Sequence, residues 1–447
     1  MSYFPLSLIQ KFKLYRKNKA KTLKKYREFD KNQYLSKKEL DSLIREKLLV
    51  LLQHSQENVP YYTKIFNEIK LNLNSFTMED FQKIPILTKQ ICQENFSDLL
   101  AQNMRRDQWD YHSTSGSTGE PFQFRIDKHF GIVRGAIQLL FDQWMGYQRR
   151  KDRILHIVGH CPNSVVSVLY NRYGRKTACI SAWDAEDEDK LKEIISFKPK
   201  YIYGYTSAIL KLATYLEENN INLKEIKAVV TTSETLTREQ RERIETGFRA
   251  PVFDQYGSRE FGFVAGECQE HKGLHIVEES FIVEIIKNNF SESNRNIGKL
   301  IITCLDNFSM PFIRYDTGDL VEDNTVSCTC GRTLKLIPHV LGRITDFITL
   351  PSGNKISFLF FNSFFEDYGP YISEFQVIQL EKCLLIKVVP TENFTLEIRN
   401  NTINGISKII NFELEVKIQE VAHIPLESSG KRLVIKKFQS NKRLDNK

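Results

Sequence analysis

Residues 112–122 combine the residue types that can bind an anion. They read His-Ser-Thr-Ser-Gly-Ser-Thr-Gly-Glu-Pro-Phe, so hydroxyl side chains are mixed with two glycines that allow backbone conformations with positive φ. Successive amide N–H groups in such a turn can form a concave nest, and the hydroxyls add further donors for a polyphosphate. No Gly-Lys-Ser/Thr follows the second glycine, which excludes a Walker A loop. A solvated Ser/Gly turn is the alternative interpretation.

Four more polar clusters follow this loop along the chain. They are 253–260 (Phe-Asp-Gln-Tyr-Gly-Ser-Arg-Glu), 314–320 (Arg-Tyr-Asp-Thr-Gly-Asp-Leu), 342–346 (Gly-Arg-Ile-Thr-Asp) and 428–432 (Ser-Ser-Gly-Lys-Arg). Taken singly, each cluster is typical of a turn or a solvated loop. A lone acid or arginine is also more often structural or solvated than catalytic. Only their common order along the chain therefore supports a functional interpretation.

Helices and strands that alternate along the chain must position these clusters. Ser36 and Glu39 form a capping box ahead of an apolar helical pattern, which predicts a helix over residues 37–54. The segments 201–204 and 228–232 indicate short buried strands with a helical segment between them. This alternation predicts an α/β layered domain with parallel strands.

The same patterns predict three parts of the chain. Residues 1–35 form a basic N-terminal extension, residues 36–342 a large domain and residues 343–447 a small one. From Val277 onward the sequence pattern predicts β-strands, and in the last hundred residues it predicts several strands and one helix. No linker rich in proline or glycine marks the second boundary.

Composition and charge are those of an ordinary globular protein with a basic start. The chain has 447 residues, of which 41% are hydrophobic and 26% charged, and its net charge is +8. Nine basic residues lie between Lys11 and Arg27, a pattern compatible with a helix on an anionic membrane or on nucleic acid. A solvated helix is the plainer alternative. We expect no nucleic-acid partner and, at most, peripheral contact with an anionic membrane.

The start of the chain and its hydropathy predict a cytoplasmic location, peripheral to the inner membrane face if the basic segment binds there. Residues 1–10 lack the apolar core of a signal peptide. No run approaches the ~20 apolar residues that cross a bilayer. Eight cysteines in a chain of this length favour a reducing compartment over a disulfide scaffold.

In their order and separations the five motifs resemble those of the adenylate-forming superfamily. Within it they resemble the phenylacetate-CoA ligase family, particularly its capsular polysaccharide biosynthesis (CapK-like) branch. The resemblance extends from Val-Pro-Tyr-Tyr at 59–62 and Ile-Pro-Ile-Leu-Thr-Lys at 84–89 to Gly-Lys at 430–431. It implies a large multi-layer α/β domain followed by a small mobile α+β domain.

The resemblance also implies how ATP is bound. The family's phosphate loop, which holds the departing pyrophosphate, corresponds to Ser113, Thr114, Ser115, Gly116, Ser117, Thr118, Gly119 and Glu120. Glu260 corresponds to the acid that binds Mg²⁺, a hard cation suited to carboxylate and phosphate oxygens. Tyr256, Gly257 and Ser258 would line the nucleotide and acyl pockets. Asp319 would accept the ribose hydroxyls.

Two cations and a hinge complete the implied site. Arg343 would donate to the ribose or to phosphate, and Lys431 would contact the substrate carboxylate and the α-phosphate as the electrostatic catalyst. Asp346 falls at the hinge about which the small domain would rotate. Arg259 departs from the pattern, because many superfamily members have threonine there. Its charge either approaches the phosphates or points outward.

A second, separate site is indicated by cysteines and histidines. Cys268 and His271 have C-x2-H spacing, and Cys328 and Cys330 have C-x-C spacing, which together supply four ligands for a closed tetrahedral Zn²⁺ site. His275 could replace His271. Some members of the family look similar here and carry structural zinc. Reduced cysteines flanking a β-hairpin are the alternative.

These features predict an ATP-dependent ligase. A small carboxylic acid reacts with ATP to give an acyl-adenylate and pyrophosphate, and a thiol, expected to be that of coenzyme A, then receives the acyl group. One alternative changes the acceptor to an amine or hydroxyl of a cell-surface polysaccharide precursor. A second is a non-catalytic nucleotide-binding scaffold of polysaccharide assembly. A protein kinase is disfavoured, since its motifs are not found at usable positions.

Overall fold

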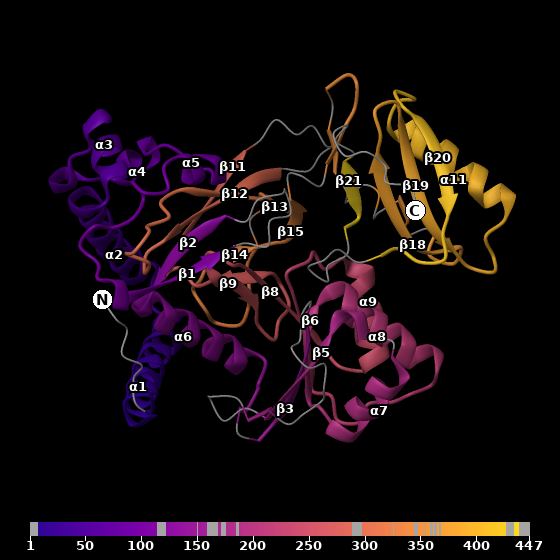
Figure 1. The fold of residues 1–447 in the computed structure, drawn as a ribbon, viewed down its shortest axis with the longest axis horizontal. Coiled ribbons are helices and arrows are strands. Elements are labelled where there is room, and N and C mark those ends of the chain that lie inside the picture. The colour runs from indigo at the N-terminus through magenta and orange to yellow at the C-terminus, as the bar shows by residue number, and fades with distance from the viewer. Residues whose placement is uncertain are drawn as a thin grey trace.

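The computed structural model describes most of the chain. It covers residues 8–113, 122–149, 151–158, 169–170, 176–184, 187–287, 297–324, 326–343, 347–353, 355–357, 361, 364–365, 368–425 and 433–437. The predicted mixed α/β fold with large sheets is confirmed, and Figure 1 shows a large unit with a smaller, mainly C-terminal unit at one end.

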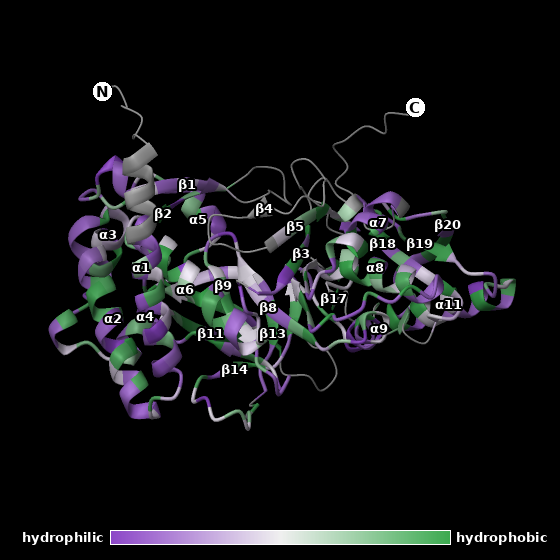
Figure 2. Cartoon of the chain, turned by 90° about the horizontal axis from the view of Figure 1, so that it is seen from below, coloured by the Kyte–Doolittle hydropathy of each residue, from purple (hydrophilic) through white to green (hydrophobic). Residues whose placement is uncertain are grey.

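Helices make up the N-terminal part of the large unit. They are α1 (Leu8–Asn32), α2 (Lys37–Asn58), α3 (Pro60–Glu68), α4 (Met78–Lys83) and α5 (Lys89–Glu94), with a 3-10 turn at Leu73–Ser75. The predicted capping box begins α2, where the Ser36 side chain accepts a hydrogen bond from the Glu39 amide. The helix runs four residues beyond the predicted end at His54, since extended backbone first appears at Val59, ahead of Pro60. Hydrophilic and hydrophobic residues alternate around α2 in Figure 2, as expected for a helix with one buried face.

A nine-stranded sheet forms the centre of the large unit. Its order is β14-β10-β9-β8-β7-β6-β3-β5-β4, with β3 (Arg153–Val158), β4 (Leu169–Tyr170), β5 (Lys176–Ser181), β6 (Tyr201–Tyr205), β7 (Ala228–Thr232), β8 (Val252–Ser258), β9 (Gly262–Glu267), β10 (Leu274–Ile276) and β14 (Leu336–Ile337). Strands β5, β3, β6, β7 and β8 are parallel neighbours, as the sequence predicts. The helices α7 (Glu188–Phe197), α8 (Thr206–Glu218) and α9 (Arg238–Phe248) lie beside these strands in Figure 1 and bury Leu212 and Ile244 against them.

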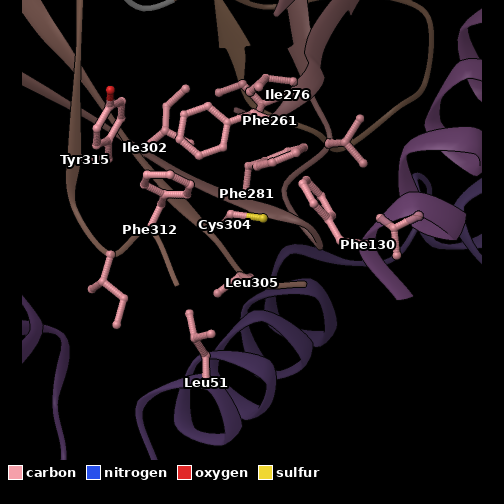
Figure 3. Packing of buried hydrophobic residues seen from close by; sticks show 14 of the residues in the cluster. Leu51, Phe130, Phe261, Ile276, Phe281, Ile302, Cys304, Leu305, Phe312 and Tyr315 are labelled. Carbon is pink, nitrogen blue, oxygen red and sulfur yellow. The ribbon is translucent and has the colours of Figure 1, made fainter. Parts of the chain in front are cut away.

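Antiparallel strands pack against the other side of the large unit. β1 (Trp109–Ser113) and β2 (Gln123–Asp127) form a hairpin, an additional 3-10 turn lies at Arg106–Gln108, and α6 (Lys128–Trp144) follows β2. A four-stranded sheet has the order β11-β12-β13-β15, with β11 (Phe281–Lys287), β12 (Ile297–Cys304), β13 (Tyr315–Glu322) and β15 (Val340–Arg343). One core joins α2, α6, β9 and this sheet, and Figure 3 shows part of it around Phe261, Phe281 and Phe312.

The C-terminal unit has a sheet and a core of its own. Its four-stranded sheet has the order β20-β19-β18-β21, from β18 (Ile372–Gln379), β19 (Cys383–Pro390), β20 (Glu415–Glu420) and β21 (Ile435–Lys437), and α11 (Leu396–Ile409) covers it. A short hairpin of β16 (Phe347–Thr349) and β17 (Lys355–Ser357) precedes it. Val377, Ile386 and Ile406 are fully buried in this separate core. The predicted boundaries at residues 35/36 and 342/343 remain predictions.

The basic N-terminal helix is fastened to the large unit by acidic side chains. α1 packs along α6, and Lys25 Nζ lies 2.8 Å from Glu279 Oε1. Lys47 of α2 reaches the same region, where its Nζ lies 2.7 Å from Asp306 Oδ1. In the described part of the chain, no helix has the length and apolar character needed to span a membrane.

We predict that Lys47→Met destabilises the large unit through Asp306. Burial acts to raise the pKa of Asp306, but the charge of Lys47, the nearby His129 and the hydrogen bond from Lys47 lower it from 3.8 to about 2. A carboxylate with a lowered pKa stabilises the fold above its unfolded pKa, and this stability is lost as the pH falls from about 4 to 2. The substitution leaves a buried charge unpaired, so urea unfolding at pH 7 should show a loss of about 3 kcal/mol.

The matched control for this substitution is Lys64→Met. Lys64 pairs with Glu68 at 4.0 Å on the surface, where both side chains are more than half exposed. We expect this change to alter the free energy of unfolding by less than about 0.5 kcal/mol. Equal losses for the two variants would contradict the assigned role of the Lys47–Asp306 pair.

Candidate active site

The turn between β8 and β9 positions the predicted Mg²⁺-binding acid. Glu260 lies in this turn, and the Ser258 side chain accepts a hydrogen bond from the Phe261 amide at 3.4 Å, which closes it. Gly257 and Gly262 face each other across the strands, and a Cβ on Gly257 would lie 2.2 Å from the carbonyl oxygen of Gly262. No side chain fits there. The close approach of the two strands therefore requires glycine at position 257, whether or not Gly257 also lines a ligand pocket.

The Glu260 carboxylate is buried, yet it has little internal hydrogen bonding. Its exposed fraction is 8%, and within the described residues the Tyr315 hydroxyl is its one hydrogen-bond donor, at 3.5 Å from Oε1. Burial, followed by the charge of Glu260, raises the pKa of Tyr315, so its hydroxyl stays protonated and can donate. The remaining carboxylate lone pairs suit a hard cation such as Mg²⁺.

Three of the predicted nucleotide-binding residues meet from three strands. The Tyr256 hydroxyl of β8 donates to Asp319 Oδ2 of β13 at 2.6 Å. Arg343 of β15 is the register partner of Asp319, and its Nε lies 3.5 Å from Asp319 Oδ1. Burial is the main cause that raises the pKa of Tyr256, and the Asp319 charge adds to it, so the tyrosine remains a donor. Asp319 is thereby oriented between Tyr256 and Arg343.

The first residues of the 314–320 motif are structural. Arg314 donates to both carboxylate oxygens of Glu284 at 3.0 Å and to the carbonyl of Ile84 at 2.6 Å. Leu87 adds a backbone pair, because its amide donates to the Arg314 carbonyl and its carbonyl accepts from the Asp316 amide. These contacts fix the start of β13, four residues before Asp319. The Ile-Pro-Ile-Leu segment therefore supports the site, because Ile84 and Leu87 make these contacts.

Other predicted residues lie at its edge or outside the described residues. Ser113 ends β1 on its hairpin with β2. The remaining phosphate-loop residues (Thr114, Ser115, Gly116, Ser117, Thr118, Gly119 and Glu120), the hinge residue Asp346 and the catalytic lysine Lys431 lie outside the described residues. Their roles remain predictions.

Sequence reasoning missed two residues of this site. Tyr315 stands inside one of the motifs, and its position beside Asp316 is a signal that could have identified it. Arg134 of α6 lies far from every motif in sequence, but its side chain meets the β8–β9 turn at Gly262. No local pattern identifies it, since an arginine within a helix is ordinarily a surface residue.

The structure brings four cysteine and histidine side chains together beyond the far end of β9. They are Cys268, His275, Cys328 and Cys330, whose ligand atoms all lie within 4.8 Å of one another. Cys268 Sγ and Cys328 Sγ are 3.6 Å apart, close to the ~3.8 Å edge of a tetrahedron with metal–sulfur bonds of about 2.3 Å. Burial, helped by the charge of Arg332, lowers the pKa of His275 to about 4, which keeps the imidazole neutral. The donor set therefore fits zinc.

His271 occupies a different environment. Its Nδ1 lies 3.1 Å from Glu267 Oε2, and its ring meets that of Phe253 edge-on at 4.6 Å. The cluster contains His275, the alternative ligand considered from the sequence, in place of His271. His275 is brought there because β10 pairs with both β9 and β14.

Comparison with known proteins relates the chain to carboxylate-activating ligases. Residues 348–437 match the family described as the CapK C-terminal domain. The phenylacetate-coenzyme A ligase of Thermus thermophilus is 25% identical over 342 residues, 72% of this chain and 74% of the relative. Protein CapK of Staphylococcus aureus is 26% identical over 302 residues, 66% of this chain and 65% of the relative.

Solved structures share the fold. A 2-hydroxyisobutyryl-CoA ligase in the postadenylation state has a TM-score of 0.72 at 18% identity, and 91% of each chain is covered. An anthranilate CoA ligase in complex with anthranoyl-AMP has a TM-score of 0.52 at 17% identity, covering 74% of this chain and 67% of the other.

The chain thus shares the fold of CoA ligases solved with acyl-adenylates, and its relatives include phenylacetate-coenzyme A ligases. Its sequence similarity extends to CapK, through both the relative named Protein CapK and the match to the CapK C-terminal domain.

We predict that Tyr256→Phe lowers the free energy of unfolding by about 2 kcal/mol. The substitution removes a short hydrogen bond to a buried carboxylate without changing the volume of the ring, and bonds to charged groups are worth about 1.5–3 kcal/mol. Urea unfolding measures the loss. Tyr34→Phe is the control, because Tyr34 is 52% exposed, and it should be neutral within about 0.5 kcal/mol. A neutral Tyr256→Phe would mean that the hydroxyl does not hold Asp319.

Proposed function

We propose that this protein joins a small carboxylic acid to coenzyme A through an acyl-adenylate. Two contacts carry the proposal: Tyr315 of β13 donates to Glu260 after β8, and Tyr256 of β8 donates to Asp319 of β13, which lies beside Arg343 of β15. These residues supply an acid for a metal ion, an acceptor for ribose hydroxyls and a cation. The relatives named phenylacetate-coenzyme A ligase support the same reaction class.

In the first step, an oxygen of the substrate carboxylate attacks the α-phosphorus of ATP. The new P–O bond gives the acyl-adenylate, and the bond to pyrophosphate breaks. Glu260 would hold Mg²⁺ against the phosphates, Asp319 would accept the ribose hydroxyls, and Arg343 would donate to the ribose or a phosphate oxygen. Residues 113–120 and Lys431 would neutralise the developing charge.

In the second step, the sulfur of coenzyme A attacks the acyl carbon and AMP leaves. The separate core of the C-terminal unit supports a rotation of this unit between the steps, with Asp346 as the hinge. The same 2-hydroxyisobutyryl-CoA ligase fits the chain with a TM-score of 0.72 in its postadenylation state and 0.59 in its thioesterification state. The arrangement of the two units is therefore closer to the postadenylation state, after the first step, than to the thioesterification state.

A second candidate changes only the acceptor. The acceptor would then be an amine or hydroxyl of a polysaccharide precursor in place of coenzyme A, as the resemblance of the sequence motifs to the capsular polysaccharide (CapK-like) branch implies. Mass spectrometry of the acylated product distinguishes the two acceptors. In either case we place the reaction in the cytoplasm, where ATP is supplied, and membrane contact through α1 stays a prediction.

Zinc bound by Cys268, His275, Cys328 and Cys330 would have a structural role. Four protein ligands fill a tetrahedral coordination sphere and leave no position for substrate. The cluster joins the loop after β9, strand β10 and the loop before β14, so a metal ion there would cross-link the edge of the nine-stranded sheet.

We predict acid-dependent exchange of labelled pyrophosphate into ATP, and we expect Lys431→Ala to lower its rate by about 10²-fold or more, since it removes the proposed electrostatic catalyst. Lys408→Ala is the matched control, because Lys408 is an exposed lysine of α11 in the same unit. If no acid of a broad panel gives exchange or AMP, with or without coenzyme A, the ligase proposal fails. ATP binding without exchange would then favour the nucleotide-binding scaffold.

We predict that the purified protein retains about one zinc ion per chain, measured by atomic emission after dialysis. His275→Ala should lose most of this zinc, whereas His271→Ala should keep it, because His271 faces Glu267. Loss of zinc from the His271 variant alone would contradict the ligand assignment, and a wild-type protein without zinc would remove the proposal.

A further inference from the structure

Arg134 extends from α6 to the turn that carries Glu260. The Cβ position that Gly262 lacks would lie 2.5 Å from Arg134 Nε and 3.2 Å from its Cγ and Cζ. Gly262 also has a φ of +70°, which L side chains rarely adopt. The absence of a side chain at Gly262 therefore makes the space in which the arginine lies.

The guanidinium of Arg134 has no hydrogen bond or ion pair with any described residue. Other arginines with little exposure behave differently: Arg149 pairs with Asp142 at 2.6 Å, Arg241 with Glu267 at 2.6 Å and Arg314 with Glu284 at 3.0 Å. An arginine keeps its charge at all physiological pH values, so a half-buried guanidinium without an acceptor is costly. Such a cost is expected at a ligand-binding site, where the bound ligand supplies the missing hydrogen-bond acceptor.

Two further basic groups lie close enough to Arg134 for their charges to interact with it. His112, on β1 just before the predicted phosphate loop, has its pKa lowered by burial and then by the charges of Arg134 and Arg259. Arg259 stands in the β8–β9 turn beside Glu260, and Arg134 is subject to the charges of both. Arg134 of α6 and Arg259 of the turn are therefore two cations whose charges act on each other, and the charge of Glu260 also acts on Arg134. The excess of positive charge favours an anion there.

We propose that Arg134 binds the anionic oxygens of a ligand next to Gly262, with Arg259 as a second cation nearby. This inference rests on the proposed function, because it assigns a ligand-binding residue to the same site. The planar guanidinium suits a carboxylate or a phosphate, either of which it can hold through two parallel hydrogen bonds. The anion has two possible sources: a phosphate of ATP, or a carboxylate of the acid substrate. A second carboxylate on that acid would make Arg134 a determinant of specificity.

Isothermal titration calorimetry with Arg134→Met and Arg134→Lys tests the proposal. The probes are Mg·ATP, inorganic pyrophosphate, and matched acids with one or two carboxylates (hexanoate and adipate, benzoate and phthalate), the acids with AMP present. Arg134→Met should weaken at least one probe that the wild type binds by about tenfold or more, the range for a lost charge-assisted pair. Arg134→Lys should retain part of the affinity, because it keeps the positive charge but loses the planar guanidinium that can make two parallel hydrogen bonds.

The pattern of loss identifies the source of the anion. Loss confined to Mg·ATP and pyrophosphate assigns Arg134 to phosphate, and loss confined to adipate or phthalate assigns it to a substrate carboxylate. Because these are binding measurements, they decide the inference even if no acid supports pyrophosphate exchange and the ligase proposal fails. A wild type that binds none of these probes, or a variant that binds all of them within twofold, overturns the inference.

Thermal unfolding separates this role from a structural one. A ligand-binding Arg134 has no hydrogen-bond or ion-pair partner among the described residues, so Arg134→Met should leave the unfolding temperature of the free protein unchanged or raise it. A structural arginine would lower it. Arg238→Met is the surface control, since the ion pair of Arg238 in the described part of the chain is with the exposed Glu242 of its own helix, and it should change neither binding nor stability.

Discussion

Burial of Phe261 between the two sheets is the interaction on which the site depends. The ring is fully buried, and its centroid lies 5.7 Å from that of Phe312, 5.8 Å from Tyr315 and 6.1 Å from Phe281. Figure 3 shows these rings in one group. Phe261 directly follows Glu260, so packing of the aromatic core holds the turn in one position relative to β13. The acid of the turn and the acid of the neighbouring sheet therefore keep a fixed separation.

The charged groups of the large unit fall into two kinds. Asp127 accepts hydrogen bonds from the backbone amides of Phe130, Phe308 and Ser309, and Arg314 is satisfied by a carboxylate and backbone carbonyls. Such groups stabilise loops, because their hydrogen-bonding capacity is largely used. Glu260 accepts only one long bond from the described residues. This spare capacity distinguishes groups available to ligands from groups that maintain the fold.

Much of this could be predicted from sequence, because local rules determine it. The capping box at Ser36 and the alternation of helices and strands depend on neighbouring residues, and the order of the motifs indicated Glu260 and Asp319. The metal cluster needed more than spacing: C-x2-H pointed to His271, whereas the pairing of β10 with β9 and β14 brings His275 to the cysteines. Arg134 could not be predicted, since its relation to Gly262 exists only after α6 packs on the turn.

Strand β9 begins at the glutamate turn and ends one residue before Cys268. The catalytic turn and the cysteine cluster are thus the two ends of one six-residue strand, about 20 Å long. Side chains alternate between faces along a strand, so a single-residue insertion within β9 would exchange its two faces and move Cys268 away from Cys328. The chain can vary in length within its surface loops, but the length of β9 is constrained from both ends at once.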